Sequence, residues 1–264
     1  MRYYVVSDIH GFYTEMISAL KDKGYFEDNT PHKLIVCGDL FDRGSEAKEL
    51  QRFILELLEK DEVILIKGNH EDLALDLINN PKKYLWDLYT ALTSHHYRNR
   101  TMDTFLQLTD YELKDAIKNV KDFAAKSKET PFVKTIIPAM RNYFETTNYI
   151  FVHGWIPCVA HGARAQADIF YYKPDWRNAK ADSWNYEHWH NGMLAWSQGV
   201  KEPNKTIVCG HWHASYGHSK IENKCSEHGE DAIFTPFIAD GIIALDACTA
   251  HFGFVNCVVI EEKD

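Results

Sequence analysis

The chain has 264 residues, of which 45% are hydrophobic and 25% are charged, and its formal net charge at pH 7 is -9. This length and apolar content predict a single globular domain over residues 1–264 with a buried core. The negative charge argues against general nucleic-acid binding and against binding to anionic membranes, since both need clustered Lys and Arg.

The sequence carries no targeting or membrane-spanning pattern. No apolar run is long enough to cross a bilayer, and no signal-peptide pattern follows Met1, so we expect a cytoplasmic protein. The six cysteines lack Cys-x-x-Cys spacing, and Cys37, Cys209 and Cys257 lie in apolar runs. That placement is typical of reduced thiols in a core.

The first third of the chain alternates between strands and helices. Apolar, β-rich segments at residues 2–7, 33–37 and 62–66 predict strands. Apolar spacing over residues 13–23 and 45–59 predicts the two helices between them. This β-α-β-α-β order predicts an α/β fold with parallel strands joined by right-handed crossovers.

The rest of the chain combines a helical region with a second set of strands. Residues 71–147 are mostly polar with helical spacing, which predicts a helical insertion over one edge of the sheet. Strand character returns in five later segments: 148–152, 206–209, 233–238, 242–245 and 252–260. The turn signal Asp240-Gly241 predicts an antiparallel hairpin that finishes a second sheet.

The connection over residues 155–198 is unusually rich in Trp and Tyr. Such a segment either covers an edge of the core or forms a lid and a substrate platform. For any single aromatic side chain, packing into the core is the favoured interpretation of the two.

Five predicted strands end in residue types that bind metal ions. The five junctions are Asp8-Ile9-His10-Gly11, Gly38-Asp39-Leu40-Phe41-Asp42-Arg43-Gly44, Gly68-Asn69-His70-Glu71, His153-Gly154 and Gly210-His211-Trp212-His213. Because the carboxyl ends of parallel strands meet at one edge of a sheet, we expect these side chains to converge. Asp8 and His10 are two positions apart, as are His211 and His213, so each pair faces the same way on an extended segment.

The junctions supply too many ligands for one divalent ion and about enough for two. Mixed oxygen and imidazole donors suit Mn, Fe, Zn or Co rather than Ca. Asp39 is the natural bridging carboxylate, and two ions about 3.5–4 Å apart can hold a hydroxide that attacks phosphorus. The predicted metal ligands are Asp8, His10, Asp39, Asn69, His153, His211 and His213.

Neighbouring residues are suited to phosphoester hydrolysis. His70 directly follows Asn69, so its side chain should lean away from the metals. Asp42 can raise the pKa of His70, which favours an imidazolium that protonates a departing alkoxide. Arg43 can bind phosphoryl oxygens through two hydrogen bonds. The predicted catalytic residues are therefore His70, Asp42 and Arg43, and the predicted substrate contacts are Arg43, Asn69 and His70.

The ordered set of motifs resembles the calcineurin-like metallophosphoesterase superfamily. Asp42-Arg43-Gly44, Asn69-His70-Glu71 and Val152-His153-Gly154 followed by Ile156-Pro157 resemble its phosphoprotein phosphatase branch, which includes bacterial Ser/Thr phosphatases and symmetrical dinucleoside tetraphosphatases. The resemblance implies a four-layer α/β/β/α sandwich around a dinuclear centre. It implies one metal on Asp8, His10 and Asp39, with His213 as a further candidate, and a second metal on Asp39, Asn69, His153 and His211.

The sequence departs from that branch at one place. Many of its protein phosphatases carry a second phosphate-binding arginine near a Trp in the lid segment, but residues 194–198 contain no arginine. The candidates to replace it are Arg98, Arg100, Arg164 and Arg177.

Three functional hypotheses follow, and the first two imply a phosphorylated substrate. The first is a phosphomonoesterase of the Ser/Thr protein phosphatase type that acts on phosphoprotein. The second is a hydrolase of dinucleoside polyphosphates in which lid aromatics stack on a base. The third, a catalytically silent metal-binding scaffold, is disfavoured because Asp42, Arg43 and His70 are all present.

Overall fold

The first part of the chain forms the expected parallel β-α-β-α-β unit. A computed structural model describes residues 1–162 and 168–262. The unit consists of β1 (Arg2–Val6), α1 (Tyr13–Asp22), β2 (His32–Cys37), α2 (Ala47–Glu59) and β3 (Val63–Ile66). The three strands pair in parallel in the order β1, β2, β3.

Apolar spacing explains how these elements pack. In α2, the buried residues Ala47, Leu50, Ile54 and Leu57 recur every three to four positions, so one face of the helix covers the sheet. All residues of β3 are buried because the sheet is covered on both faces. Helix α1 ends just before Gly24, whose φ of +77° suits a helix C-terminus.

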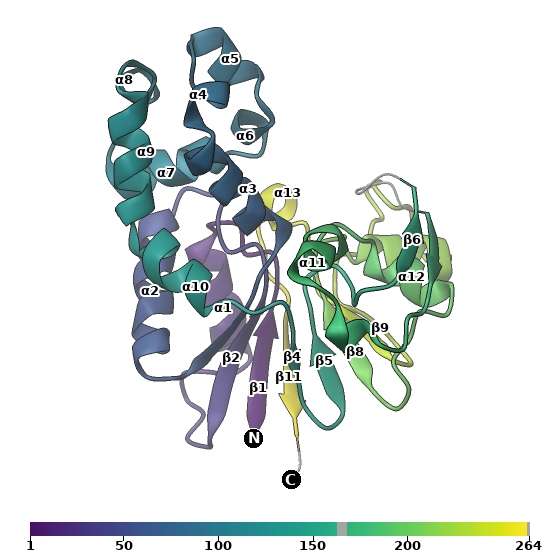
Figure 1. Cartoon of the computed structure of the whole chain (residues 1–264). Helices are drawn as coiled ribbons and strands as arrows, with labels where there is room; N and C mark the ends of the chain where they lie inside the picture. Colours follow the sequence, from purple (N-terminus) through teal and green to yellow (C-terminus); the bar gives the residue numbers. More distant parts are fainter. Residues whose placement is uncertain (163–167, 263–264) are drawn as a thin grey trace.

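Most of the helices that follow β3 extend above the carboxyl ends of β1, β2 and β3, and the last of them, α10 (Ile137–Ala139), returns beside α2 (Figure 1). They are α3 (Asn69–Asn79), α4 (Pro81–Tyr84), α5 (Leu88–Thr93), α6 (His95–Arg98), α7 (Thr101–Thr109), α8 (Leu113–Lys118), α9 (Val120–Glu129), the π-helical turn η1 (Phe132–Ile136) and α10 (Ile137–Ala139). Helix α3 begins at Asn69, two residues before the expected start, because the Glu71 carboxylate accepts a hydrogen bond from Gly68 N at 2.7 Å.

The second sheet is mixed. It contains β4 (Phe144–Glu145), β5 (Tyr149–Phe151), β8 (Thr206–Cys209), β10 (Ile242–Ala244) and β9 (Phe237–Ala239), in that spatial order. Strands β5, β8 and β10 are parallel, and β9 and β10 form the expected antiparallel hairpin. Between β8 and β9 lies a π-helical turn, η4 (Gly217–Ile221).

The end of the tail does not continue this hairpin. After the short helix α13 (Thr249–Phe252), strand β11 (Cys257–Glu261) pairs antiparallel with β1 in the first sheet. The alternation of apolar residues predicts a strand here but does not say which edge it joins. Its pairing covers the edge of β1 that β2 leaves open.

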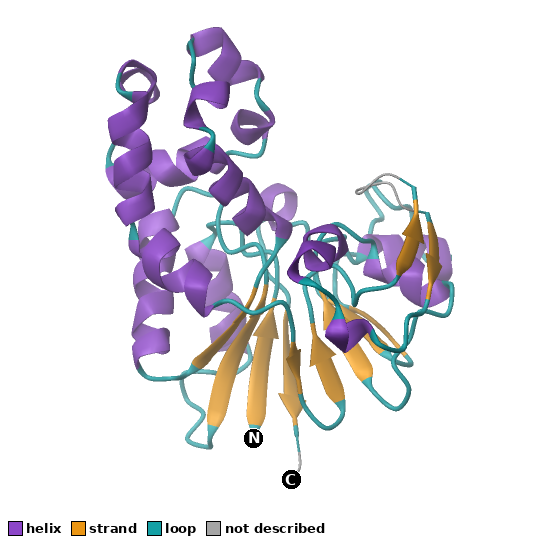
Figure 2. Cartoon of the chain, in the orientation of Figure 1, coloured by secondary structure: helices purple, strands orange, loops and turns teal. Residues whose placement is uncertain are grey.

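The two sheets pack face to face, with helices on their outer faces (Figure 2). Side chains of both sheets fill the space between them, including Val5 and Ile35 from the first and Phe151 and Val208 from the second. A second apolar cluster joins α1 and α2 to the first sheet, and a third covers the outer face of the second sheet. The expected α/β/β/α layers are therefore confirmed.

The aromatic segment covers the second sheet. It consists of β6 (Val159–His161), β7 (Ile169–Tyr171), the 3-10 turn η3 (Trp176–Asn178), α11 (Ala181–Glu187) and α12 (Gly192–Ser197). Trp155, Trp176 and Trp184 are buried in its core, so the packing interpretation holds for them. Tyr171 and Tyr186 are exposed.

Two further expectations concern the whole chain. All six cysteines lie in the described part and are free thiols, and Cys37, Cys209 and Cys257 are buried as expected. Within residues 1–162 and 168–262, no helix is both long and apolar enough to cross a bilayer.

Candidate active site

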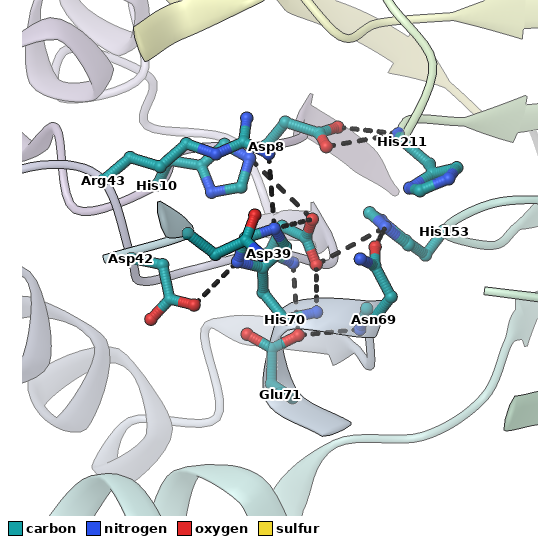
Figure 3. Close-up of polar contacts among 12 residues, drawn as sticks. Asp8, His10, Asp39, Asp42, Arg43, Asn69, His70, Glu71, His153 and His211 are labelled. Atoms are coloured by element: carbon teal, nitrogen blue, oxygen red, sulfur yellow. Dashed lines mark hydrogen bonds and ion pairs between the residues drawn. The ribbon is translucent and has the colours of Figure 1, made fainter. Parts of the chain in front are cut away.

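The loops after β1, β2, β3, β5 and β8 meet at one edge of the sheets, where most of the predicted metal ligands gather around Asp39 (Figure 3). Asp39 Oδ2 lies 3.8 Å from His10 Nε2, and Asp39 Oδ1 lies 3.4 Å from His153 Nε2. Asp39, His153 and His211 each place a ligand atom within 4.8 Å of the others, and so do His10, Asp39 and His70. One carboxylate thus faces imidazoles on both of its sides.

Hydrogen bonds to backbone carbonyls orient two of these imidazoles. His153 Nδ1 lies 2.8 Å from the Cys37 carbonyl, and His10 Nδ1 lies 3.1 Å from the Phe41 carbonyl. A carbonyl only accepts, so each Nδ1 carries the proton and each Nε2 presents a lone pair. His153 Nε2 faces Asn69 Oδ1 at 2.8 Å as well as Asp39. Lone pairs that face one another in this way fit a bound cation.

The protonation states also fit a metal centre. Burial lowers the pKa of His10, His153 and His211, the last to about 3, so these rings are neutral at pH 7. Burial would raise the pKa of Asp39, but its electrostatic interactions with His153, His70 and the other surrounding imidazoles outweigh burial and lower that pKa far below its usual value. Metal binding requires this combination of a carboxylate with neutral imidazoles.

Asp8 adds negative charge beside this group. Its carboxylate oxygens accept from His211 N at 3.0 and 3.2 Å, and it also bonds to the Ser7 hydroxyl. Burial, followed by the negative charges of Asp246 and Asp39, raises the pKa of Asp8 well above its usual value. Carboxylates buried this closely need positive charge nearby, which bound cations would supply.

Left-handed backbone turns aim these side chains. The described chain contains several non-glycine residues with positive φ, and six of them gather here: Asp8, His10, Asp39, Asp42, Arg43 and His211. Each such residue costs about 1–3 kcal/mol and is typical of functional sites. The expectation that Asp8 and His10, or His211 and His213, lie on extended segments is therefore wrong, because β1 ends at Val6 and β8 at Cys209.

The structure does not bring His213 to this centre. His213 Nδ1 lies 2.8 Å from the Ser215 hydroxyl, and His213 Nε2 lies 3.6 Å from Glu227 Oε1. Its ligand group is formed with Glu227 and His228, and among the described residues no group that contains Asp39 includes it. The φ of +66° at His211 turns the chain so that the two histidines separate.

His70 is held beside the predicted ligands by Asp42. Nδ1 of His70 lies 2.7 Å from Asp42 Oδ2. Burial would lower the pKa of His70, but the Asp39 charge and the Asp42 hydrogen bond outweigh burial and raise it. Arg43 Nη2 lies 3.3 Å from His70 Nε2. When His70 is charged, the Arg43 guanidinium and the His70 imidazolium are both hydrogen-bond donors, so together they can form an anion-binding site.

Two threonines of α7 hold Asp42, and no sequence motif indicated them. The Thr101 hydroxyl donates to Asp42 Oδ2 at 2.7 Å, and the Thr104 hydroxyl donates to Oδ1 at 2.8 Å. Thr104 also accepts from Asp42 N at 3.0 Å. The helical insertion thus fixes the carboxylate that orients His70.

We expect Thr101→Val to lower kcat for an alkyl phosphomonoester by roughly 10–100-fold, the usual effect of losing an outer hydrogen-bond partner at such a site. The reason is that Asp42 loses a donor and His70 is less firmly oriented. The measurement is steady-state kinetics. Thr109→Val is the matched control, because Thr109 lies on the same helix and, among the described residues, its hydroxyl bonds only to the Phe105 carbonyl. Equal rates in the two variants would contradict this role.

Glu71 fixes the loops that carry Asp39 and Asn69. Besides capping α3, its carboxylate accepts from Asp39 N at 3.2 Å and from Leu40 N at 3.0 Å. The backbones also approach closely, because a Cβ on Gly68 would lie 2.1 Å from Asp39 Oδ1. Glu71 is part of the motif Gly68-Asn69-His70-Glu71, but the sequence alone did not indicate what its side chain does.

A cavity of about 560 Å³ lies beside Arg43, and two of the four arginines that could replace the second phosphate-binding arginine contribute to its wall. Arg98 and Arg100 line it together with Phe12 and His251. Arg100 Nη1 donates to the Arg43 carbonyl at 3.3 Å. Arg177 instead forms ion pairs with the carboxylates of Glu145, in β4 of the second sheet, and Glu202. Arg164 lies outside the described residues.

Comparison with known proteins identifies the family. A family model described as calcineurin-like phosphoesterase matches residues 1–241. The chain belongs to the calcineurin-like phosphoesterases. This result confirms the resemblance seen in the motifs and the metallophosphoesterase fold that it implied. Members of this family bind two metal ions, in agreement with the buried His and Asp groups around Asp39.

Individual relatives of this phosphoesterase match over shorter stretches. The chain is 40% identical over 98 residues to bis(5'-nucleosyl)-tetraphosphatase PrpE [asymmetrical] of Bacillus velezensis, over 34% of this chain and 39% of that protein. It is 33% identical over 98 residues to serine/threonine-protein phosphatase 1 of Salmonella typhimurium, over 35% of this chain and 43% of that protein. The matches thus span less than half the length of these relatives.

A solved structure extends the similarity of fold to almost the whole chain. A cold-active protein tyrosine phosphatase aligns with a TM-score of 0.53 at 15% identity, over 98% of this chain and 73% of that one. At this identity the match supports the fold alone.

Proposed function

We propose that this phosphoesterase is a metal-dependent hydrolase of phosphomonoesters with alkoxide leaving groups, such as phosphoserine and phosphothreonine in proteins. The observation that carries the proposal is the buried His70–Asp42 pair, with its 2.7 Å contact and the raised pKa of His70. An alkoxide is a poor leaving group and needs a proton as the P–O bond breaks. His70 is placed to donate that proton from Nε2.

The donor set indicates which residues would hold the metals. Two bound ions, for which we propose Mn, Fe or Zn, would polarise the phosphoryl group and activate water for attack. One ion would be held by Asp8, His10 and Asp39, and the other by Asp39, Asn69, His153 and His211.

The chain's own cationic groups would position the substrate. Arg43 would donate to the phosphoryl oxygens, beside Nε2 of His70 at 3.3 Å. Asn69 and His70 follow each other at the N-terminus of α3, where backbone N–H groups and the helix dipole favour a negative charge. Negative charge that develops on phosphorus-bound oxygens would therefore be stabilised from two sides.

A substrate comparison tests the proposal. Metal-free protein is reloaded with Mn, Fe or Zn, and kcat/KM is measured for a phosphoserine peptide and for diadenosine tetraphosphate. We expect turnover of the peptide to depend on added metal and to match or exceed that of the tetraphosphate. If the tetraphosphate is turned over far faster, the phosphomonoesterase assignment is wrong.

The cavity beside Arg43 favours dinucleoside polyphosphates as the second candidate. Arg98 and Arg100 are exposed at its wall, next to the half-buried Arg43, so several phosphates in a row would find cationic partners there. Its aromatic side chain is Phe12, whereas the buried Trp176 of the aromatic segment does not line it. A base stacked in this cavity would contact Phe12.

Arg100→Gln separates these candidates. If polyphosphate occupies the cavity, we expect KM for diadenosine tetraphosphate to rise by about tenfold, because one charge-assisted hydrogen bond of roughly 1.5 kcal/mol is lost. KM for a small aryl phosphate, which reaches only Arg43, should change little. Arg52→Gln is the control, because Arg52 is an exposed arginine of α2 that does not line the cavity. Equal changes in KM for both substrates would argue against a polyphosphate subsite.

A further inference from the structure

A second group of metal-ligand side chains lies in the aromatic segment, apart from the site around Asp39. Cys158, Glu187 and His190 each place a ligand atom within 4.8 Å of the others. Cys158 follows the loop that carries His153, Glu187 is the last residue of α11, and His190 comes three positions later. Glu187 and His190 are only 4% and 3% exposed.

The three side chains converge on a single ring nitrogen. Cys158 Sγ lies 3.8 Å from His190 Nδ1, and Glu187 Oε2 lies 2.6 Å from the same atom. A catalytic Cys-His-acid arrangement would place the thiol and the acid on opposite nitrogens of the ring. Here both approach Nδ1, whose one proton serves only one of them, so the geometry does not match a nucleophilic triad.

The buried oxygen Glu187 Oε2 lacks a hydrogen-bond partner among the described residues. Although it lies close to His190 Nδ1, it makes no hydrogen bond of acceptable geometry with any described residue. A buried carboxylate oxygen without a hydrogen bond is costly, and such atoms commonly mark a bound ion or water. The unsatisfied oxygen, the thiol sulfur and Nδ1 all lie within 4.8 Å of one another.

We propose that Cys158, Glu187 and His190 form a second kind of metal site, for zinc or a similar borderline transition-metal ion. Thiolate, imidazole and carboxylate are the donors that zinc takes in proteins, whereas a sulfur donor excludes Mg and Ca. A tetrahedral zinc separates its sulfur and nitrogen ligands by roughly 3.6 Å and its oxygen and nitrogen ligands by roughly 3.3 Å. The Sγ–Nδ1 distance is 3.8 Å, and Glu187 Oε2, now 2.6 Å from Nδ1, would move away from it by a rotation of its side chain on binding. The three residues line a cavity of about 300 Å³, which leaves room for water as a fourth ligand.

Binding changes the protonation of the cluster in a defined way. Burial raises the pKa of the Cys158 thiol well above its usual value, so the thiol is protonated when no cation is bound. An incoming divalent ion forms the metal–sulfur bond as the S–H proton leaves to solvent, and it takes the Nδ1 lone pair when the ring proton resides on Nε2. The ion's two positive charges are then balanced by the thiolate and the Glu187 carboxylate.

The ion would also stiffen the wall of the Asp39 site. Trp155 N donates to the Glu187 carbonyl at 3.1 Å, which ties the loop after β5 to the end of α11. Between Glu187 and His190, His188 Nδ1 lies 3.1 Å from Asp72 Oδ2. The Trp189 backbone hydrogen-bonds to His211. A metal that joins Cys158 to this turn would hold His211 through Trp189 without touching substrate.

Cobalt binding to the full chain tests the proposal. A thiolate ligand gives Co²⁺ an intense near-ultraviolet charge-transfer band, and the other His and carboxylate groups within the described residues contain no sulfur. We expect wild type to show this band at saturating Co²⁺ and Cys158→Ser to lose it. Cys225→Ser should keep it, because Cys225 belongs to no described ligand group. Zinc should displace the cobalt and abolish the band.

Two results would overturn the site. One is the absence of a thiolate band in wild-type protein, which does not depend on whether any variant folds. The other is a band of unchanged intensity in Cys158→Ser, which would assign it to another cysteine. Glu187→Gln provides a second, nearly isosteric variant: we expect it to weaken Co²⁺ binding at this site by at least about tenfold while the band persists at high cobalt. Unchanged affinity would remove Glu187 from the ligand set.

Discussion

Asp39→Asn is expected to reduce metal-dependent hydrolysis by at least about 1,000-fold. Asp39 lies at the centre of the site, with His10 and His70 on the side of Oδ2 and His153 on the side of Oδ1. An amide supplies one neutral oxygen in place of two charged ones, so it cannot bridge two ions. The loss of Lewis-acid stabilisation is several kcal/mol, and about 4 kcal/mol corresponds to a 1,000-fold change in rate.

The measurement is turnover of an aryl phosphate at saturating Mn²⁺, together with the bound metal content. Asp61→Asn is the matched control, since Asp61 is also an aspartate with left-handed backbone, at φ +55° compared with +53° at Asp39, but is exposed at the surface. The Asp61→Asn variant tests whether replacing Asp by Asn is tolerated at a residue with left-handed backbone. A residual rate above a tenth of wild type in Asp39→Asn, with metal content unchanged, would refute the bridging role.

His70→Asn is expected to lower kcat by about 10²–10⁴-fold for an alkyl phosphate, but much less for a phosphate with a good leaving group. The difference arises because only an alkoxide needs the proton that His70 supplies. The raised pKa of His70 also predicts a pH dependence. The imidazolium is fully present below that pKa and is lost as pH rises through it, so wild-type activity toward alkyl phosphates should fall on the alkaline side.

A pH–rate profile for both substrate types checks this role. The alkaline decline that His70 causes should be absent in His70→Asn. His96→Asn is a matched control, because His96 is also a buried histidine close to a carboxylate, Asp76 at 3.1 Å, but lies in the helical insertion. Equal losses on good and poor leaving groups in His70→Asn would argue for a structural role instead of proton donation.

The sequence was sufficient to predict the order of elements and the place of the site. Strands before Asp8, Asp39 and Asn69 carry uninterrupted apolar runs, and such runs report local burial. Because parallel strands end at a common edge, the residues that follow them meet whatever the details of packing. The gathering of Asp8, Asp39 and Asn69 was therefore predictable from chain order. His153 and His211 follow strands of the second sheet, and the face-to-face packing of the two sheets brings them to Asp39.

Side-chain direction within the loops was not predictable in this way. The φ of +66° at His211 separates His213 from Asp39, whereas the turns at Asp8 and His10 keep both near it. A ligand motif fixes spacing along the chain, but the sign of φ at each position depends on the tertiary contacts that stabilise the turn.

The sequence by itself, through its family motifs, predicted the metallophosphoesterase layers and most of the side chains that gather around Asp39. Only the tertiary structure decided that Thr101 and Thr104 hold Asp42, that Arg98 and Arg100 rather than Arg177 adjoin Arg43, and that β11 pairs with β1. Periodicity records which face of an element is buried. It does not record which distant side chain covers that face, because contacts between residues some 60 positions apart are set by how the helices and sheets pack.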